Sequence, residues 1–189
     1  SEAAVLEPLA GVARQAGAPD LADQLLAMRQ WMAIDLQQLE EHLRHLEGLE
    51  TEPEAAKAAA QYVLESGGKR VRPLIVLLAS RLGRSVASED VRNLAVTCEL
   101  IHAATLLHDD VIDQASERHH KNTARKIWGN KASILTGDYL HACAFQMIAS
   151  LESPLVMNVL SNAVRNVVEG ELDQLKFIRN PKVSKTQYL

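Results

Sequence analysis

Three aspartates stand close together at the end of an apolar run, Asp109, Asp110 and Asp113 in LLHDDVID. In a helix Asp109 and Asp113 lie on one face, with Cβ atoms about 5–6 Å apart, and Asp110 is turned away. Like charges at this spacing repel, and the negative end of the helix dipole adds to the repulsion. A cation would offset it, and because every donor is a carboxylate oxygen, Mg²⁺ or Mn²⁺ is favoured. The plainer alternative is a solvated helix end with three ordinary acids.

Basic side chains lie on both sides of these acids in the sequence. Lys69, Arg70 and Arg72 follow two glycines in GGKRVRP, where a chain can turn closely around an anion. Four more basic residues come after the acids: Arg118, Lys121, Arg125 and Lys126. Arginine forks match phosphate oxygens in pairs. Metal-binding carboxylates with two basic clusters fit a site for two polyphosphates, one held through metal and one directly. Either cluster alone would be an ordinary solvated loop.

The elements that must position these residues are helices. Period-two alternation is absent and glycines number only nine, so strands are not expected. Helices are expected over about 20–48, 53–66, 73–83, 89–113, 131–151 and 154–177, with Asp20 and Ser88 as N-caps. The fold class is therefore all-α, an antiparallel helical bundle with short connections.

Two of these helices carry informative patterns. The stretch LAVTCELIHAATLL within 89–113 is apolar on nearly all sides, which is typical of a helix at the centre of a bundle. The first helix keeps one apolar face through three-to-four spacing. That face comprises Leu21, Leu25, Met28, Met32, Leu36, Leu39, Leu43 and Leu46.

The bulk composition excludes several classes of protein. The chain has 189 residues, and its net charge of −4 argues against a general nucleic-acid surface. No run of about 18 apolar residues predicts a membrane span, and the start lacks the pattern of a signal peptide. Cys98 and Cys143 fall in apolar helical pattern and are interpreted as small buried side chains in a reducing compartment. We therefore expect a cytoplasmic protein.

Four ordered motifs resemble those of the trans-isoprenyl diphosphate synthases, most of all the long-chain, octaprenyl-type enzymes. They are GGKRVRP, LIHAATLLHDDVID, GNKASILTGDYL and EGELDQL. The resemblance begins near Tyr62 and predicts an N-terminal helical extension over 1–50 and the N-terminal two-thirds of an isoprenoid synthase domain over 51–189.

The resemblance implies a role for each matching residue. Lys69, Arg70 and His102 would hold isopentenyl diphosphate, and Arg118 would contact the allylic diphosphate. The metal ligands would be Asp109, Asp113 and Asp110, binding Mg²⁺, with two or more ions in a complete site. Gln174 would face the reacting centre and act with Asp109 and Asp113 in catalysis. The reaction implied is ionisation of the allylic diphosphate, attack of the isopentenyl double bond on the cation, and loss of a proton.

The residues before the acids bear on product length. In this family, bulky aromatics four or five residues before the first aspartate block the growing chain. Here those positions are Thr105 and Ala104, with Ile101 one turn deeper. Small side chains would leave a tunnel open, so a long-chain polyprenyl product is expected. The alternative is that Ala104 and Thr105 are small only for helix packing.

The chain departs from the family pattern in two places. His119, expected among the substrate-binding residues, stands where a second arginine is usual, and His120 stands where a glycine is usual. The second aspartate motif and a lysine–threonine pair are not found before Leu189. Three interpretations stay open: a synthase whose C-terminal part is absent from this sequence, a non-catalytic or half-site subunit that needs a partner chain, and a helical interaction protein. The family also implies a homodimer, and a lipid product that would bring it to a membrane surface.

Overall fold

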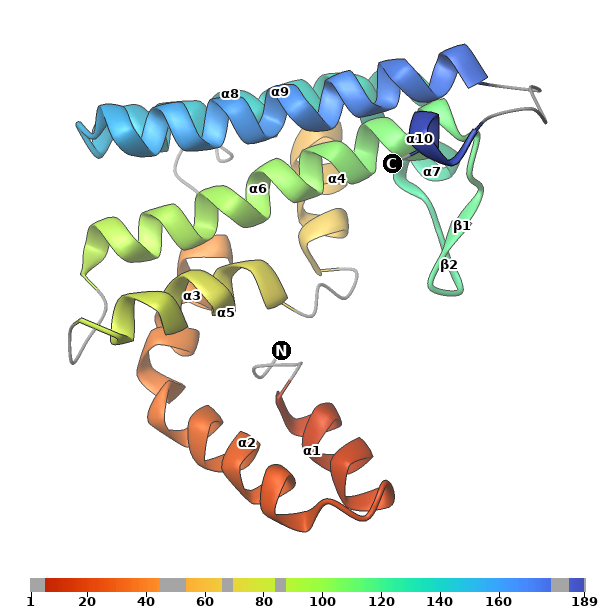
Figure 1. Cartoon of the computed structure of the whole chain (residues 1–189). Helices are drawn as coiled ribbons and strands as arrows, with labels where there is room; N and C mark the ends of the chain where they lie inside the picture. The colour runs from red at the N-terminus through yellow and green to blue at the C-terminus, as the bar shows by residue number, and fades with distance from the viewer. Residues whose placement is uncertain (1–5, 45–53, 66–69, 84–87, 178–183, 189) are drawn as a thin grey trace. The chain divides into compact units, whose positions relative to one another are not determined.

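The computed structural model describes residues 6–44, 54–65, 70–83, 88–177 and 184–188, and the regular elements in these ranges are helices and one short hairpin (Figure 1). The helices are α1 (Leu6–Gln15), α2 (Pro19–Trp31), α3 (Ala33–Arg44), α4 (Glu54–Glu65), α5 (Val71–Arg81), α6 (Glu89–Ile112), α7 (Ala124–Trp128), α8 (Asn130–Ser150), α9 (Pro154–Phe177) and α10 (Lys185–Tyr188). The all-α prediction is confirmed. The chain forms two compact units, Ser1–Leu151 and Glu152–Leu189.

Helix α6 is the centre of the first unit, as its apolar sequence predicts. It packs against α3, α4, α5, α7 and α8 (Figure 1). Ser88 caps it, because the side chain accepts a hydrogen bond from the backbone N–H of Val91 at 3.4 Å. Asp113 closes the other end, where its N–H donates to the carbonyl of Asp109 at 2.8 Å. The run of carboxylates therefore stands at the C-terminal end of the central helix.

Helix α8 packs closely against α6 at Gly137. A Cβ at this position would lie 2.3 Å from Nε2 of His108, so only a glycine fits without displacing the imidazole. The His108 Nε2–H donates to the carbonyl of Ile134 at 3.1 Å, and the same nitrogen lies 3.3 Å from Oδ1 of Asp138. The residue next to Asp109 is thus fixed against α8.

The single helix expected over 20–48 is two helices, α2 and α3, which meet at Met32. The hydrogen bonds from Met32 N–H to Met28 O and from Leu36 N–H to Met32 O continue across the junction, each 3.0 Å long. The prediction of Asp20 as N-cap is wrong: Pro19 fixes the start of α2, Ala18 is the N-cap, and Asp20 lies in the first turn.

The predicted apolar face of these helices forms much of the core. Met32, Leu36, Leu39 and Leu43 are buried with residues of α4, α5, α6 and α8, and Leu25 and Met28 pack against them. Leu21 is exposed instead, because α2 diverges here to pack against α1 through Ala10, Ala13 and Ala22. The predicted position Leu46 lies outside the described residues.

Two strands form a small hairpin that the sequence analysis did not predict. Strand β1 (Glu117–Arg118) pairs antiparallel with β2 (Lys121–Asn122). His119 and His120 make the turn, with φ angles of 50° and 64°. Positive φ at both central residues is the type I′ requirement of a two-residue hairpin turn, so histidine occupies positions that usually favour glycine or asparagine. The hairpin is tied to α4, because the hydroxyl of Tyr62 donates to the carbonyl of Asn122 at 2.5 Å.

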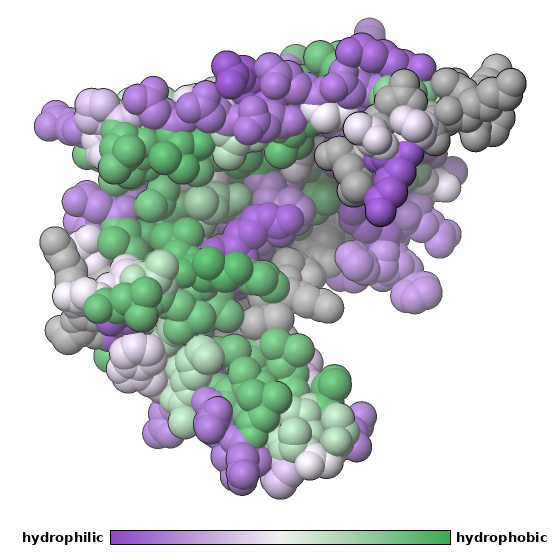
Figure 2. Space-filling model, in the orientation of Figure 1, coloured by the Kyte–Doolittle hydropathy of each residue, from purple (hydrophilic) through white to green (hydrophobic). Residues whose placement is uncertain are grey.

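Exposed apolar side chains occur in both units. In the first unit Val71, Ile75 and Leu82 are exposed at and beyond α5, and Figure 2 shows hydrophobic surface over this helix. In the second unit α9 exposes Leu155, Val159, Val168, Leu172 and Leu175. Among the described residues, no helix is both long enough and apolar enough to cross a membrane. Cys98 and Cys143 are free thiols and half-buried.

Candidate functional site

A pocket of about 520 Å³ lies in the first unit between α4, the start of α5, the middle of α6 and the hairpin. Its polar lining residues are Tyr62, Arg70, Arg72, Glu99, His102, Asp110, Arg118, His119, Lys121, Asn122 and Thr123, and its apolar ones include Val63, Leu64, Ala103 and Leu106. Four cationic side chains thus face two carboxylates around one cavity. Arg70 and Arg72 of the GGKRVRP motif meet here with the residues that follow the acids, from which they are far apart in sequence.

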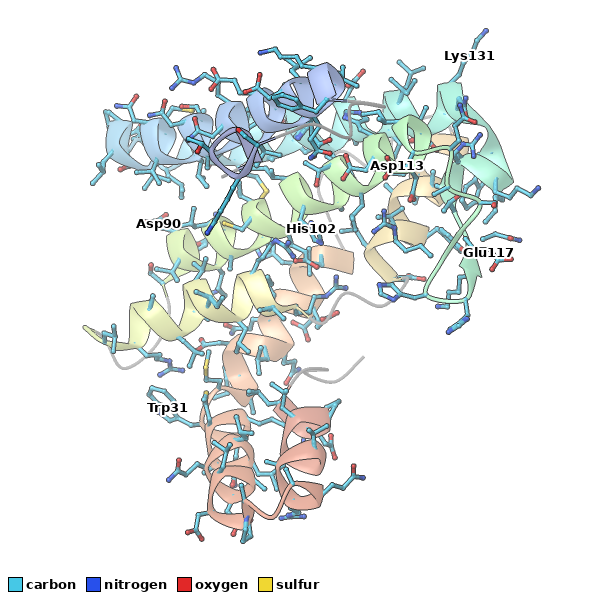
Figure 3. All side chains as sticks on the ribbon, turned by 45° about the vertical axis from the view of Figure 1, so that its right-hand side comes forward. Trp31, Asp90, His102, Asp113, Glu117 and Lys131 are labelled. Carbon is cyan, nitrogen blue, oxygen red and sulfur yellow. The ribbon has the colours of Figure 1, made fainter. Side chains whose placement is uncertain are left out.

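Helix α6 supplies one wall of the pocket. Glu99, His102, Ala103, Leu106 and Asp110 recur at three-to-four spacing, which places them on one face. Figure 3 shows His102 midway along α6, between Asp90 at one end and Asp113 at the other. Burial lowers the pKa of His102, and the charges of Arg72 and Arg118 lower it further, with Glu99 opposing them. The imidazole is therefore a neutral hydrogen-bonding group near pH 7.

The hairpin supplies the opposite wall through Arg118. Its Nε and a terminal nitrogen donate to Oδ1 of Asp110 at 3.1 and 2.9 Å. Asp110 is buried, whereas the Arg118 side chain is 38% exposed and can still meet a ligand in the pocket. Asp110, which was expected to be turned away from Asp109 and Asp113, therefore has Arg118 as its partner in this structure. Its role as a metal ligand stays a prediction.

Arg70 is held by three different elements. Its Nε donates to Glu40 of α3 at 3.0 Å, and its terminal nitrogens donate to Glu99 of α6 at 2.9 Å and to the carbonyl of Leu64 of α4 at 2.7 Å. Burial alone would lower the pKa of Arg70, but the hydrogen bonds and charges of Glu40 and Glu99 outweigh it and raise the pKa. The predicted contact of Arg70 with a diphosphate stays a prediction, and Lys69 lies outside the described residues.

Arg72 is the cation of GGKRVRP that the sequence analysis left without a role. It is exposed and lines the pocket, close enough to His102 for its charge to lower the pKa of the imidazole. Residues two apart at a helix start face different directions. This spacing predicts that the two side chains differ in environment: Arg70 lines the pocket as a buried, ion-paired side chain, whereas Arg72 lines it as an exposed one.

Asp109 and Asp113 stand at the end of α6 but do not line this pocket. Asp109 is half-buried and Asp113 is exposed. Among the residues that the structure describes, no three histidine, cysteine, aspartate or glutamate side chains group closely enough to hold a metal ion. Two carboxylates on one helix face nevertheless fit Mg²⁺, which commonly takes one or two carboxylates and leaves its other positions to water and phosphate. They would form one side of a metal site.

The residues predicted to set product length differ in burial. Ala104 is completely buried in the core, which is what the packing alternative requires. Thr105 is half-buried, and its hydroxyl donates to the carbonyl of His102 at 2.8 Å. Ile101 is half-buried and packs against the core. Their role below the acids stays a prediction.

Gln174 lies on α9 in the second unit. Its side-chain amide donates to Oε1 of Glu171, one turn away, at 3.4 Å, and both side chains are exposed. The role predicted for Gln174 at a reacting centre stays a prediction.

Residues 53–189 match the family model for polyprenyl synthetase. This chain belongs to the polyprenyl synthetase family. Its sequence is 40% identical over 144 residues to octaprenyl diphosphate synthase from Escherichia coli (strain K12), covering 76% of this chain and 44% of that protein. It is 39% identical over 153 residues to heptaprenyl diphosphate synthase component 2 from Geobacillus stearothermophilus, covering 81% of this chain and 47% of that protein.

The fold of this polyprenyl synthetase family member also matches a solved structure. A polyprenyl synthase from Caulobacter crescentus CB15, complexed with calcium and isoprenyl diphosphate, superposes with a TM-score of 0.68 at 33% identity, covering 87% of this chain and 48% of that one. The chain thus spans less than half the length of these relatives. The four motifs that suggested the trans-isoprenyl diphosphate synthases lead to the same family, and that recognition is confirmed.

Proposed function

We propose that this chain carries the isopentenyl diphosphate site of a prenyltransferase that makes a long-chain trans-polyprenyl diphosphate. The pocket is the observation that carries this proposal. Its lining brings Arg72, Lys121 and Arg118 around one cavity, while the carboxylates of Glu99 and Asp110 are engaged by Arg70 and Arg118. The surplus positive charge suits a diphosphate, and arginine forks bind its oxygens in pairs.

The apolar part of the pocket suits the rest of such a substrate. Val63, Leu64, Ala103 and Leu106 line it beside the cationic groups. A short hydrocarbon with a diphosphate head would place its head among the arginines and its tail on this surface. Apolar walls also exclude water, which would otherwise capture the carbocation that the reaction forms.

The allylic diphosphate would bind at the end of α6. Asp109 and Asp113 would hold Mg²⁺ there, with two or more ions in a complete site, and the bound metal would neutralise the leaving diphosphate. The Caulobacter structure is complexed with calcium and isoprenyl diphosphate, which supports the proposal of a divalent cation and a diphosphate in this chain. Arg118 would contact the allylic diphosphate from the pocket side, and Gln174 would face the reacting carbon atoms.

The proposed catalytic step uses these positions. The allylic C–O bond would break, and the electron pair would leave with the diphosphate. The isopentenyl double bond would then attack the cation, and the resulting cation would lose a proton to the released diphosphate and form the new double bond. A long-chain product accords with the octaprenyl and heptaprenyl names of the two relatives.

A second candidate is a subunit that completes its site only with a partner chain. The relative from Geobacillus stearothermophilus is named as component 2 of its enzyme, which favours this alternative. In either case we propose a cytoplasmic homodimer or hetero-oligomer that meets a membrane surface through its lipid product.

Calorimetric titration with isopentenyl diphosphate tests the pocket directly. We expect saturable binding by the unaltered chain and at least about tenfold weaker binding by Arg72→Met, a loss of about 1.4 kcal/mol. Lys131→Met is the matched control, because Lys131 is exposed and does not line the pocket (Figure 3). Equal affinity of Arg72→Met and the unaltered chain would contradict the proposal.

A second experiment tests the metal carboxylates and the need for a partner. Titration of an allylic diphosphate should depend on Mg²⁺, and Asp109→Asn should remove that dependence while leaving isopentenyl diphosphate binding intact. Product formed by the homogeneous chain alone would exclude the partner-dependent alternative. Product formed only after addition of a second chain would support it.

A further inference from the structure

Arg70 occupies an unusual place at the rim of the pocket. It is the N-cap of α5, with φ 50° and ψ 31°, in the left-handed region that side chains other than glycine seldom adopt. Its carbonyl accepts the first hydrogen bond of α5, from the N–H of Leu74 at 3.0 Å. Any shift of Arg70 would therefore shift the whole first turn of α5, which contains Arg72.

The side chain of Arg70 joins three elements that are distant in sequence. Glu40 comes from α3, the Leu64 carbonyl from the end of α4, and Glu99 from α6. The Arg70 side chain is only 8% exposed, and those of Glu40 and Glu99 are 14% and 6% exposed. The Arg70 guanidinium thus lies buried in ion pairs at the edge of the pocket, whereas Arg72 two residues later lines the pocket as an exposed side chain.

Stability alone gives a poor account of this arrangement. A non-glycine residue in the left-handed region is strained, and such strain persists where the surrounding structure fixes it, often beside a ligand site. Buried ion pairs also gain little over apolar packing because their charges must be desolvated. The backbone strain and the desolvated charge both occur at Arg70, two residues before Arg72, which lines the pocket.

We propose that Arg70 is a positioning residue, and that its bonds to Glu40 and Glu99 hold the start of α5 so that Arg72 meets the diphosphate. The inference rests on the proposed function, because it assumes that Arg72 binds the anion. It also gives helix α3 a part in the site through Glu40, which does not line the pocket itself.

A second ion pair provides a matched control. Arg81 at the far end of α5 donates to Asp35 of α3, with Nε 3.0 Å from Oδ2. Both side chains are buried, at 7% and 0% exposure, so this pair desolvates as much charge as the pair of Arg70 and Glu40. It links the same two helices, but neither residue lines the pocket.

Substitution of Glu40 separates positioning from simple electrostatics. Glu40→Asp keeps the charge and shortens the side chain, whereas Glu40→Gln keeps the shape and removes the charge. If charge alone mattered, Glu40→Asp would leave anion affinity unchanged, and Glu40→Gln would raise it by removing a carboxylate. If Glu40 positions Arg70, both substitutions weaken binding, because the start of α5 loses its restraint.

The test is calorimetric titration of the unaltered chain and these variants with inorganic pyrophosphate. We expect both Glu40 variants to bind about tenfold more weakly, equivalent to about 1.4 kcal/mol, and Asp35→Asn to bind within about twofold of the unaltered chain. Thermal unfolding of each variant shows whether Glu40→Gln and Asp35→Asn lose similar stability, so that a change in binding is not mistaken for a loss of fold.

The contrary outcomes are distinct. Unchanged or tighter binding by Glu40→Gln overturns the inference, and so does an equal loss in Asp35→Asn. Arg70→Lys binding as tightly as the unaltered chain, while Glu40→Asp also does, would make Arg70 dispensable as a positioning group. Failure of the proposed function looks different: the unaltered chain would not bind pyrophosphate, or Arg72→Met would bind it as tightly, and the inference would fall with it.

Discussion

Replacing Gly137 by alanine would place a methyl group 2.3 Å from Nε2 of His108. This nitrogen donates to the carbonyl of Ile134, so the imidazole must leave that hydrogen bond or α8 must move away from α6. Asp109 follows His108 directly, and any displacement of this turn of α6 reaches the carboxylates. The substitution therefore tests whether the close approach of α6 and α8 supports the end of α6.

The magnitude follows from three contributions. Inserting a methyl group into a packed contact costs about 1–3 kcal/mol. Loss of the His108 hydrogen bond costs about 0.5–1.5 kcal/mol. Alanine is better than glycine within a helix by about 1 kcal/mol, which offsets part of this. We expect the free energy of unfolding to fall by about 1–3 kcal/mol, and the midpoint of thermal unfolding to fall by about 2–4 °C for each kcal/mol.

Circular dichroism during heating measures this change. The same substitution made in a His108→Ala chain tests whether the imidazole is the cause. In a His108→Ala chain the methyl group meets no imidazole, so Gly137→Ala should raise stability there by about the 1 kcal/mol of helix propensity. A change of sign between the two backgrounds identifies the contact with His108 as the cause. Destabilisation of equal size in both backgrounds, or none in either, would refute the reasoning.

Three further predictions follow from single residues. Burial and neighbouring positive charge lower the pKa of His102, and burial and His108 lower that of His141. The unfolded chain therefore takes up protons first, and stability measured by urea titration should fall as pH drops below about 6.5, less steeply in His102→Asn. His120→Gly should raise the midpoint of thermal unfolding, because glycine relieves a left-handed conformation that costs about 1 kcal/mol; a lower midpoint would contradict this. Thr105→Phe should shorten the product in a reconstituted enzyme, measured by chromatography of the released prenols, and an unchanged length would discard its role.

Long helices were predictable because their apolar patterns extend over many turns. The expected helices at 89–113, 131–151 and 154–177 agree with α6, α8 and α9 to within about one residue at each end. The hairpin was not predictable, because strands of two residues carry no periodicity. The turn could not be recognised from its residues either, because His119 and His120 stand where glycine or asparagine would have indicated positive φ.

The sequence predicted which residues belong to the site better than it predicted the contacts that these residues make. His102, Arg118 and His119 were predicted to bind substrate, and all three line the pocket. The ion pairs of Arg70 with Glu40 and Glu99 are contacts that only the folded chain reveals. Glu40 stands 30 residues before Arg70, in a helix whose polar face looks like any solvated surface. Long-range pairing of this kind leaves no local pattern.

The ion pairs of helix α3 bear on where the folded unit begins. The family match starts at residue 53, yet α3 lies before it and supplies Asp35 and Glu40 to arginines of the matched part. A shortened chain beginning at residue 53 would leave Arg70 and Arg81 without these acidic partners and would uncover the core around Leu39. Expression of such a chain should therefore yield insoluble or poorly folded protein, and the smallest autonomous unit must reach back to include α3.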